Sequence, residues 1–341
     1  MSATTIDALA ATVGDLKPLL GSDSRALALR RALLAGPLKA LPAKVPGVAE
    51  SVLGPLRGAL ALPAARISSR LAAEDGTTKW AMEFGDGQSA ETVLIPSRTR
   101  GTVCVSSQSG CTRACAFCAT ATLGFRRNLT AGEIVLQYLI ARDAAALTGL
   151  EASNVVFMGM GEPLDNLDAV LAAARSLIDV FPGLSPRRVT VSTSGVVPRM
   201  GRFLRESRAS LALSLNASDD DTRTRIMPHN KTWPLASIMS VLREAAAERP
   251  RRFFVEYVQL PGVNDSAADA ARIADLLRGL DVHVNVIPHN PFPGSPFQAP
   301  AREDTLRFHD QIKAQGLTGI IRWPRGRDVA GACGQLALRT G

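Results

Sequence analysis

The sequence predicts an α/β protein built on a full or partial (β/α) barrel, with a small helical segment and a β-hairpin before the barrel. From residue 101 onward, short apolar runs alternate with longer helical stretches, which is typical of parallel strands joined by helices. About six such repeats suit a barrel, and polar or glycine-rich residues follow the apolar runs, where barrels form their sites. We therefore divide the chain into four parts, residues 1–75, 76–100, 101–322 and 323–341.

Composition indicates a folded protein of a reducing compartment. Of 341 residues, 46% are hydrophobic and 21% are charged, which argues against bulk disorder. Lys and Arg exceed Asp and Glu by 39 to 31, and the net charge of +8 is compatible with a polyanion such as RNA without requiring one. Five cysteines are an odd number for a secreted disulfide framework. We read no signal peptide or membrane span, and expect a cytoplasmic protein without a membrane partner.

The first two parts are predicted from helical periodicity and from turn residues. Helices are expected at 5–20, 24–34 and 67–74. Four prolines interrupt this pattern: Pro42, Pro46, Pro55 and Pro63. A hairpin follows, in which Gly85-Asp86-Gly87 joins strands at 78–84 and 89–96, and Glu91 lies on the second strand.

The third part supplies the predicted barrel. Strands are expected at 102–105, 154–158, 188–192, 211–215, 253–259, 283–288 and 318–322. Helices are expected between them, at 131–147, 167–181, 235–248, 267–280 and 302–315. Because sites form where barrel strands end, the residues directly after each strand are the first candidates for ligand contacts.

Three cysteines lie in the loop after the first barrel strand. Cys111, Cys115 and Cys118 are spaced by four and three residues, with no fourth cysteine nearby. Thiolates with this spacing can hold a cube-shaped iron–sulfur cluster and leave one iron open for a substrate. Structural zinc sites use four ligands, often as two pairs, so we favour a cluster over zinc. We also favour it over three incidental buried cysteines.

The cysteine spacing, with Phe117 before the last cysteine, resembles the radical S-adenosylmethionine (SAM) enzymes. Residues 75–337 resemble one branch of them, the adenine-C2 methyltransferases that act on 23S ribosomal RNA and on tRNA. The blocks that begin at Cys104 and at Cys333 are far more specific than the cluster motif. The matching blocks are 79–80, 91–93, 104–108, 124–129, 159–163, 189–198, 290–294, 325–328 and 333–336.

The resemblance implies the ligands of two cofactors. A [4Fe-4S] cluster would be held by Cys111, Cys115 and Cys118, and its open iron would bind SAM. Further SAM contacts would come from residues at the strand ends: Gly161, Glu162, Ser192, Ser214, Leu215, Asn216 and Asn290. The family often has His where this chain has Asn216. The alternative for each Ser or Asn is a helix cap.

The resemblance also implies the catalytic residues and the partners. Cys333 would accept a methyl group from one SAM, and a second SAM, cleaved at the cluster, would convert it to a radical that adds to adenine. Glu91 would take the C2 proton. Cys104 would then attack the sulfur of Cys333, releasing RNA and leaving a transient disulfide bond. The partners would be 23S rRNA, tRNA and an electron donor of the flavodoxin or ferredoxin type, with the enzyme acting as a monomer.

Two other functions are compatible with the sequence. One is methylation of C8 of the same adenine, the antibiotic-resistance branch of the family, and the other is a non-enzymatic iron–sulfur protein that binds RNA or senses redox state. Arg322, Arg325 and Arg327 would contact phosphates, lower the pKa of Cys333, or lie in a solvated tail. The N-terminal part, which would be an accessory RNA-binding domain, matches the family poorly. The four histidines are interpreted as structural or solvated.

Overall fold

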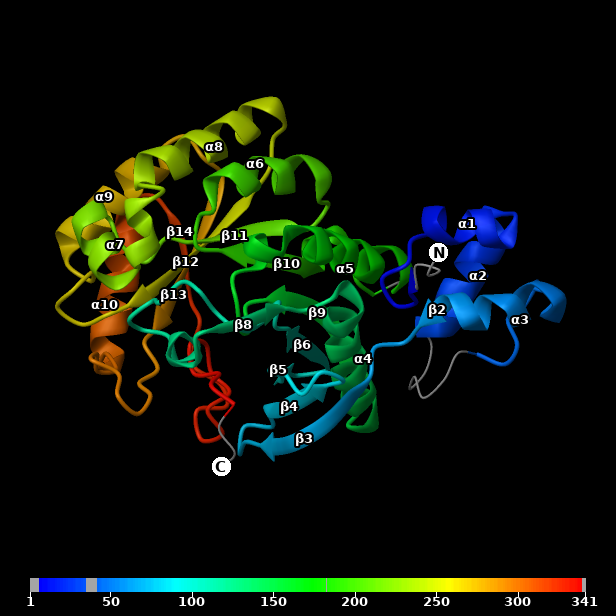
Figure 1. The fold of residues 1–341 in the computed structure, drawn as a ribbon. Coiled ribbons are helices and arrows are strands. Elements are labelled where there is room, and N and C mark those ends of the chain that lie inside the picture. Colours follow the sequence, from blue (N-terminus) through cyan, green and yellow to red (C-terminus); the bar gives the residue numbers. More distant parts are fainter. Residues whose placement is uncertain (1–5, 35–41, 182, 339–341) are drawn as a thin grey trace.

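A ten-stranded sheet forms the framework of the computed structural model, which describes residues 6–34, 42–181 and 183–338 (Figure 1). The strand order is β14-β13-β12-β11-β10-β9-β6-β5-β4-β3. The bounds are β3 (Ala65–Ala72), β4 (Thr78–Phe84), β5 (Ser89–Ser97), β6 (Arg100–Cys104), β9 (Glu151–Phe157), β10 (Val189–Thr193), β11 (Ser210–Ser214), β12 (Phe253–Gln259), β13 (Val282–Pro288) and β14 (Thr318–Ile321).

Strands β6 and β9 to β14 pair in parallel, whereas β3 to β6 pair antiparallel. The sheet ends at β14 on one side and at β3 on the other, so the barrel is open. The predicted α/β class with a partial barrel is thus confirmed. All seven expected barrel strands are present, each within a few residues of its predicted bounds.

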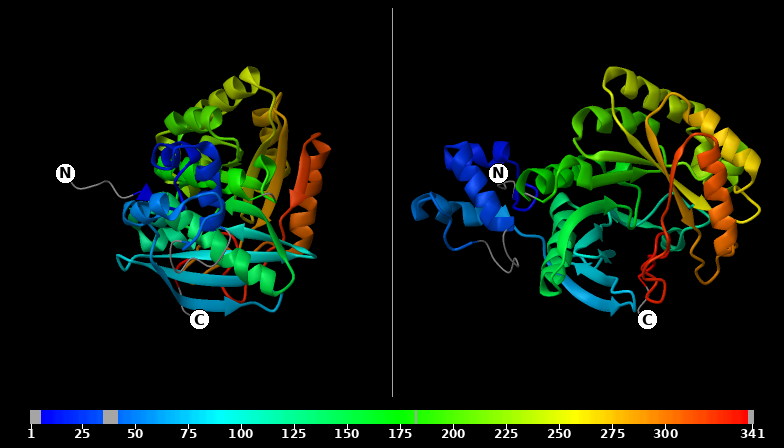
Figure 2. Two further views of the ribbon diagram at one scale, coloured as in Figure 1. Left: turned by 90° about the vertical axis from the view of Figure 1, so that its right-hand side faces the viewer. Right: turned by 180° about the vertical axis from the view of Figure 1, so that it is seen from behind.

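Helices cover the outside of the parallel strands (Figures 1 and 2). They are α4 (Ala131–Leu147), α5 (Leu167–Val180), α6 (Val197–Glu206), α7 (Asp220–Ile226), α8 (Leu235–Glu248), α9 (Ala267–Leu277) and α10 (Arg302–Ala314). The sequence analysis did not anticipate α6 and α7. The main core lies between these helices and the strands, whose central residues Val155, Val191, Leu213, Val255 and Val284 are fully buried. No helix in the described part of the chain is long and apolar enough to cross a membrane.

The hairpin is present as predicted, but the segment before it is not helical. Residues expected to form a helix at 67–74 lie instead in β3, which pairs antiparallel with β4 from Ala65↔Phe84 to Ala72↔Thr78. Most β3 side chains are exposed. Its sequence therefore shows neither the two-residue apolar repeat of a strand nor the 3.6-residue repeat of a helix. This segment is a strand because it pairs with the free edge of the hairpin at β4. Its local sequence does not reveal this pairing.

The N-terminal helices differ in their bounds from the prediction. Thr5 lies outside the described residues, and α1 (Val13–Leu20) begins only after a capping box formed by Thr12 and Asp15. Helix α2 (Asp23–Leu34) agrees with the expected 24–34. The remaining elements, not predicted, are α3 (Glu50–Ala59), which contains Pro55, and the short parallel pair β1 (Ile6–Asp7) and β2 (Leu60–Ala61).

Polar contacts attach these N-terminal elements to the barrel helices. The side chain of Asp7 accepts a hydrogen bond from the backbone N–H of Gly132 in the first turn of α4, at 2.9 Å. The buried Arg30 of α2 donates to the hydroxyl of Ser176 on α5, at 2.8 Å. A carboxylate at a helix N-terminus is stabilised by the free N–H groups there.

We predict that Asp7→Ala lowers the free energy of unfolding by about 1 kcal/mol, because it removes a carboxylate cap from α4. Asp23→Ala is the matched control, because Asp23 makes only an exposed ion pair with Lys17, and should change stability by less than about 0.5 kcal/mol. Denaturant-induced unfolding of the three proteins measures the difference. Equal midpoints for wild type and Asp7→Ala would contradict the capping role.

Candidate active site

The three cysteines lie in a loop closed by a two-stranded ladder. Strand β7 (Gln108–Gly110) pairs antiparallel with β8 (Phe125–Asn128), and the loop between them carries Cys111, Cys115 and Cys118. Gly110 has a φ of +78°, and a Cβ there would collide with the carbonyl of Gly124. The close approach of the two strand ends therefore requires glycine at this position.

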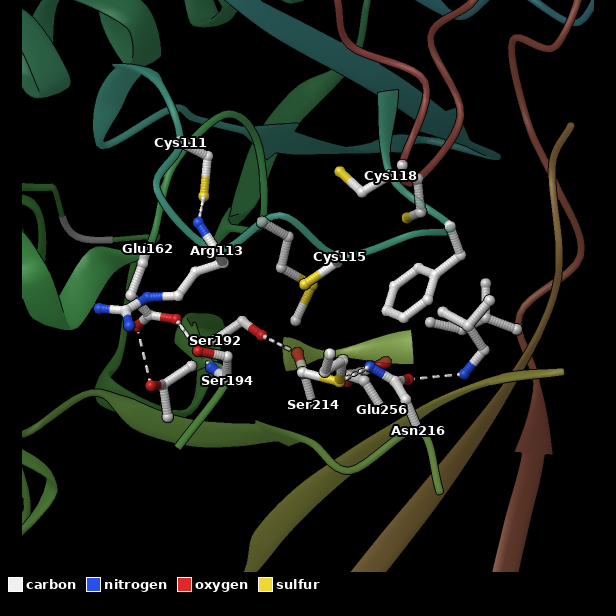
Figure 3. A pocket seen from close by; sticks show the side chains of 18 of the residues that line it. Cys111, Arg113, Cys115, Cys118, Glu162, Ser192, Ser194, Ser214, Asn216 and Glu256 are labelled. Atoms are coloured by element: carbon white, nitrogen blue, oxygen red, sulfur yellow. Dashed lines mark hydrogen bonds between the residues drawn. The ribbon is translucent and has the colours of Figure 1, made fainter. Parts of the chain in front are cut away.

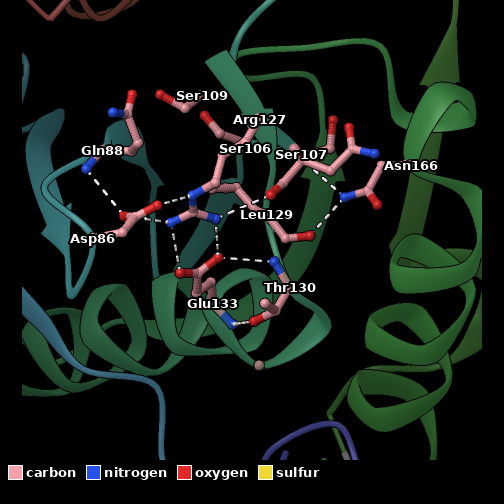
Figure 4. Close-up of polar contacts among 12 residues, drawn as sticks. Asp86, Gln88, Ser106, Ser107, Ser109, Arg127, Leu129, Thr130, Glu133 and Asn166 are labelled. Atoms are coloured by element: carbon pink, nitrogen blue, oxygen red, sulfur yellow. Dashed lines mark hydrogen bonds and ion pairs between the residues drawn. The ribbon is translucent and has the colours of Figure 1, made fainter.

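Charged and polar side chains connect the β7–β8 ladder to neighbouring elements (Figure 4). Arg127 of β8 donates to Asp86 in the hairpin turn at 2.9 Å and to Glu133 of α4 at 2.7 Å. Asn166 donates to the carbonyls of Ser107 and Leu129, at 2.9 and 2.7 Å. These bonds link the hairpin, α4 and the start of α5 to the base of the cysteine loop.

A cavity of about 920 Å³, counted with its open mouth, lies at the carboxyl ends of the barrel strands (Figure 3). The cavity brings together the three loop cysteines and Cys333 with most of the predicted SAM contacts. Those that line it are Gly161, Glu162, Ser192, Ser214, Asn216 and Asn290.

Leu215 is the predicted contact that does not line the cavity. Its side chain is fully buried in the core. Its backbone N–H donates to the carbonyl of Glu256, and its carbonyl accepts from Arg223. A SAM contact by Leu215 stays a prediction.

Glu162 is held by four donors. One carboxylate oxygen accepts from the backbone N–H of Leu164 at 3.0 Å and from the hydroxyl of Thr193 at 2.8 Å. The other accepts from the N–H and the hydroxyl of Ser194, at 2.8 and 2.6 Å. Because a carboxylate offers about four lone pairs, those of Glu162 are engaged in fixing the ends of β9 and β10.

Asn216 adopts a left-handed backbone conformation with a φ of 56°. Asn tolerates this conformation better than most residues. Its side-chain carbonyl accepts from the N–H of Val258 at 2.8 Å, and its own carbonyl accepts from Asn264, also at 2.8 Å. Asn216 therefore joins the end of β11 to β12 as well as lining the cavity.

Glu91 and Cys104 lie on neighbouring strands outside the cavity lining. Glu91 forms an ion pair with Lys79 at 2.8 Å, with both side chains buried, and accepts from the backbone N–H of Leu338 at 3.1 Å. Burial raises the pKa of the Cys104 thiol, and the nearby Cys333 raises it further. Both cysteines are free thiols, so the structure contains no disulfide bond between them.

The segment after β14 carries Cys333 into the cavity (Figure 1). Arg325 pairs with Asp75 in the turn between β3 and β4 at 2.8 Å. Asn290 donates to the carbonyl of Cys333 at 3.2 Å, and Ala119 donates to that of Gly334 at 2.7 Å. The segment thus spans the opening of the barrel between its two edge strands.

Two charged residues set the electrostatic environment of Cys333: Arg322, which the sequence analysis singled out, and Glu256, which it did not. Cys333 is exposed to the cavity, and the protein groups around it, Glu256 among them, raise the pKa of its thiol above the usual range, whereas Arg322 acts in the opposite direction. Of the three roles proposed for Arg322, this favours the lowering of the pKa of the Cys333 thiol. Glu256 was missed, although it is the one charged residue in the apolar run at 253–259.

The cavity residues fit an iron–sulfur cluster with SAM. Burial raises the pKa of Cys111 to about 12 and that of Cys115 well above its usual range, and neighbouring thiolates add to both shifts. Coordinating metal removes such protons outright. Three cysteine thiols in one cavity are the donor set that an iron–sulfur cluster uses. Among the described residues, none donates a hydrogen bond to the buried side-chain carbonyl oxygen of Asn290, which can therefore accept one from a ligand.

Fold and cavity together define a radical SAM enzyme, and the Radical SAM superfamily profile matches residues 105–274. The curated relative from Alkalilimnicola ehrlichii, a "Dual-specificity RNA methyltransferase RlmN", is 46% identical over 282 residues, 82% of this chain and 78% of the relative. The relative from Paramagnetospirillum magneticum, which has the same name, is 44% identical over 304 residues, which cover 86% of this chain and 67% of the relative. The chain belongs to this RlmN family, which confirms the resemblance.

A solved structure agrees with the assignment. A radical SAM methyltransferase from Sphaerobacter thermophilus superposes with a TM-score of 0.88 at 37% identity, covering 97% of this chain and 99% of that one. The likeness therefore includes the N-terminal elements and the C-terminal segment as well as the barrel.

We predict that replacing any one of Cys111, Cys115 and Cys118 by Ala removes the cluster, because two thiolates hold it poorly. Iron and sulfide content and visible absorbance after anaerobic reconstitution measure the loss. Cys104→Ala is the control and should keep the cluster. A full complement of iron and sulfide in any loop variant would refute the ligand assignment.

We also predict that stability falls as the pH drops from 6.5 toward 4. Burial lowers the pKa of His229 and of His289 from 6.5 to about 4. In this window the unfolded imidazoles bind protons that the folded ones do not, which favours unfolding. His229→Asn and His289→Asn should each weaken the pH dependence of the unfolding free energy, with His283→Asn as the control. An unchanged dependence in both variants would contradict neutral buried imidazoles.

Proposed function

We propose that this chain methylates carbon 2 of adenine in 23S ribosomal RNA and in tRNA. The observation that carries the proposal is the meeting of Cys111, Cys115 and Cys118 with Cys333 in one cavity. A cluster site alone occurs throughout the superfamily, whereas a cysteine beside it that can carry a methyl group suits methylation of a carbon. The family of the chain supports the same reaction class.

The target carbon explains why a cysteine is needed. Carbon 2 of adenine has no lone pair with which to attack a methyl donor. The cluster and SAM, when bound, supply the methyl group and the radical chemistry that this carbon requires. Cys333 contributes a nucleophilic sulfur that first takes the methyl group and then presents it to the base. Arg322 assists by lowering the pKa of this thiol.

Cys104 is proposed to release the product. Its thiol would attack the sulfur of Cys333, freeing the methylated RNA and leaving a disulfide that a thiol reductant opens before the next turnover. The effect of Cys333 on the pKa of the Cys104 thiol supports this role. The high pKa of Cys104 keeps it protonated and unreactive until that step.

Glu91 is proposed to take the proton that leaves carbon 2. Its carboxylate is paired with Lys79 and capped by the N–H of Leu338. The end of the C-terminal segment must therefore move before Glu91 meets RNA. We propose that the contacts of Glu91 with Lys79 and Leu338 change after RNA binds, so that Glu91 can take the proton.

The remaining partners follow from the reaction. The net charge of +8 supports phosphate contacts with RNA, and the cluster needs an electron donor, for which a flavodoxin or ferredoxin is proposed. We propose a cytoplasmic monomer. Methylation at C8 and a non-enzymatic role are disfavoured, because curated relatives at 42% to 49% identity carry the RlmN name.

Mass spectrometry of nucleosides tests the function. Ribosomal RNA and tRNA from a strain lacking the gene should lack 2-methyladenosine, and the intact gene should restore it. Loss of 8-methyladenosine instead would establish the C8 branch. Unchanged methylation in both RNAs would refute the proposal.

The variant Cys104→Ala should stall the reaction with RNA joined covalently to Cys333, because the resolving thiol is absent. Denaturing electrophoresis should show a protein–RNA band that survives thiol reductant and disappears with nuclease. The double variant Cys104→Ala, Cys333→Ala is the control and should show no band. Normal multiple turnover by Cys104→Ala would leave Cys104 as a core residue only.

A further inference from the structure

Backbone contacts bring the segment that carries Cys333 against the cysteine loop. A 3₁₀ turn, Ala119–Leu123, begins directly after the last cysteine of that loop. Its first N–H, that of Ala119, donates to the carbonyl of Gly334 at 2.7 Å. Gly334 has a φ of +80°, and a Cβ there would lie 3.2 Å from the carbonyl oxygen of Phe117. The loop and the segment therefore meet at the level of their backbones, next to Cys333.

Thr120 adds a side-chain hydrogen bond to this contact. Its hydroxyl donates to the carbonyl of Leu336 at 2.7 Å. Thr120 is 3% exposed and Leu336 is 5% exposed, so the bond is shielded from water. A buried carbonyl that loses its donor costs more free energy than an exposed one, because water cannot replace the donor. The hydroxyl of Thr120 is thus a specific tie between the loop and the segment.

The loop after β13 holds the same segment. The side chain of Asn290 donates to the carbonyl of Cys333 at 3.2 Å, and the side chain of Gln335 donates to the carbonyl of Pro291 at 2.9 Å. Four consecutive residues, 333–336, are therefore bonded alternately to the loop after β13 and to the cysteine loop. This alternation fixes the backbone on both sides of the Cys333 sulfur.

We propose that Thr120 is a positioning residue for Cys333, whose hydroxyl holds residues 333–336 against the cysteine loop and so keeps the sulfur in the cavity. This inference rests on the proposed function, which makes Cys333 the methyl carrier. Transfer of a group to a nucleophile requires reacting atoms that are aligned and about 3–3.5 Å apart. Thr120 meets this requirement indirectly, through the carbonyl of Leu336.

The step that this position serves is the first methyl transfer. The sulfur of Cys333 displaces S-adenosylhomocysteine from SAM and takes the methyl group, while the thiol proton passes to solvent. One carbon–sulfur bond forms, another breaks, and neither partner is oxidised or reduced. Methylation of Cys333 can therefore be measured without a reductant and without RNA.

Three variants separate the hydroxyl from the shape of the side chain. Thr120→Val removes the hydroxyl and keeps the branched shape, whereas Thr120→Ser keeps the hydroxyl. Thr122→Val is the matched control, because the hydroxyl of Thr122 donates within the same turn, to the carbonyl of Ala119 at 2.8 Å. Each protein is used as the full-length chain.

Hydrogen exchange, with and without the reconstituted cluster, measures the tie itself. The backbone amides of peptide 328–339, which contains Cys333, should exchange about fivefold faster in Thr120→Val, because the segment opens more often. Exchange in β10 and β11 should stay unchanged. Thr120→Ser and Thr122→Val should both resemble wild type. The arm without cluster decides the test if Thr120→Val takes up no cluster.

Mass spectrometry of the same peptide measures the consequence for the reaction. Cluster-loaded protein is incubated with SAM in the absence of reductant, and the methylated fraction of Cys333 is followed in time. Thr120→Val should methylate Cys333 about tenfold more slowly at saturating SAM, because a small displacement of a nucleophile is costly. The concentration of SAM that gives half the maximal rate should not change. Thr120→Ser should restore the wild-type rate.

Four outcomes would overturn the inference. Thr120→Val could show wild-type exchange in peptide 328–339, or faster exchange there with a normal rate of Cys333 methylation. Faster exchange throughout its barrel would give Thr120 a role in fold stability only. Failure of Thr120→Ser to restore exchange and methylation would assign the effect to packing. If wild type itself never methylates Cys333, the proposed function fails, and the exchange data still decide whether Thr120 holds the segment.

Discussion

The parallel pairing of β6 and β9 to β14 is the constraint on which the site depends. Strands that run in one direction bring the residues after their carboxyl ends to one edge of the sheet. Their register then places Ser214, Glu256 and Asn285 side by side, although these residues are far apart in the chain. Gly161, with a φ of +104°, completes this edge, since a Cβ there would lie 2.6 Å from Gln108.

Burying charged side chains at such a site costs free energy, and hydrogen bonds to the buried charges offset part of this cost. Arg223 is fully buried, and its hydrogen-bond partners among the described residues are carbonyl and amide oxygens. It donates to the carbonyls of Leu215 and Ser194, at 2.9 and 2.6 Å, and to the amide oxygen of Asn230 at 2.7 Å. Burial lowers its pKa to about 10, and these acceptors keep the cation in place at the ends of β10 and β11.

The open barrel gives the C-terminal segment its role. A closed barrel would have no gap between first and last strands, whereas here β14 and β3 are unpaired edges. The segment bridges them through Arg325 and Asp75 and brings Cys333 to the cavity. The segment is held there by hydrogen bonds to the carbonyls of Cys333 and Gly334 and by Leu336, which is buried in the main core.

The sequence by itself determined the barrel class and its strands, and it predicted which cysteines are reactive. Apolar runs with a fixed period and a cysteine spacing of four and three residues are local signals, readable without a fold. Even the capped helix α4 kept its predicted bounds, since Thr130 and Glu133 form a capping box in its own sequence. The strand ends after Gly159 and Ser192 were likewise recognisable from polar and glycine-rich composition.

Tertiary structure alone decided three other features. Segment 65–72 became a strand because the hairpin offered an edge to pair with. Glu162 became saturated because of neighbours supplied by a strand that is distant in the sequence. Cys333 came to line the cavity because the last segment returns across the barrel opening. Each of these features depends on contacts between residues that are far apart in the sequence. A local sequence pattern carries no information about such contacts.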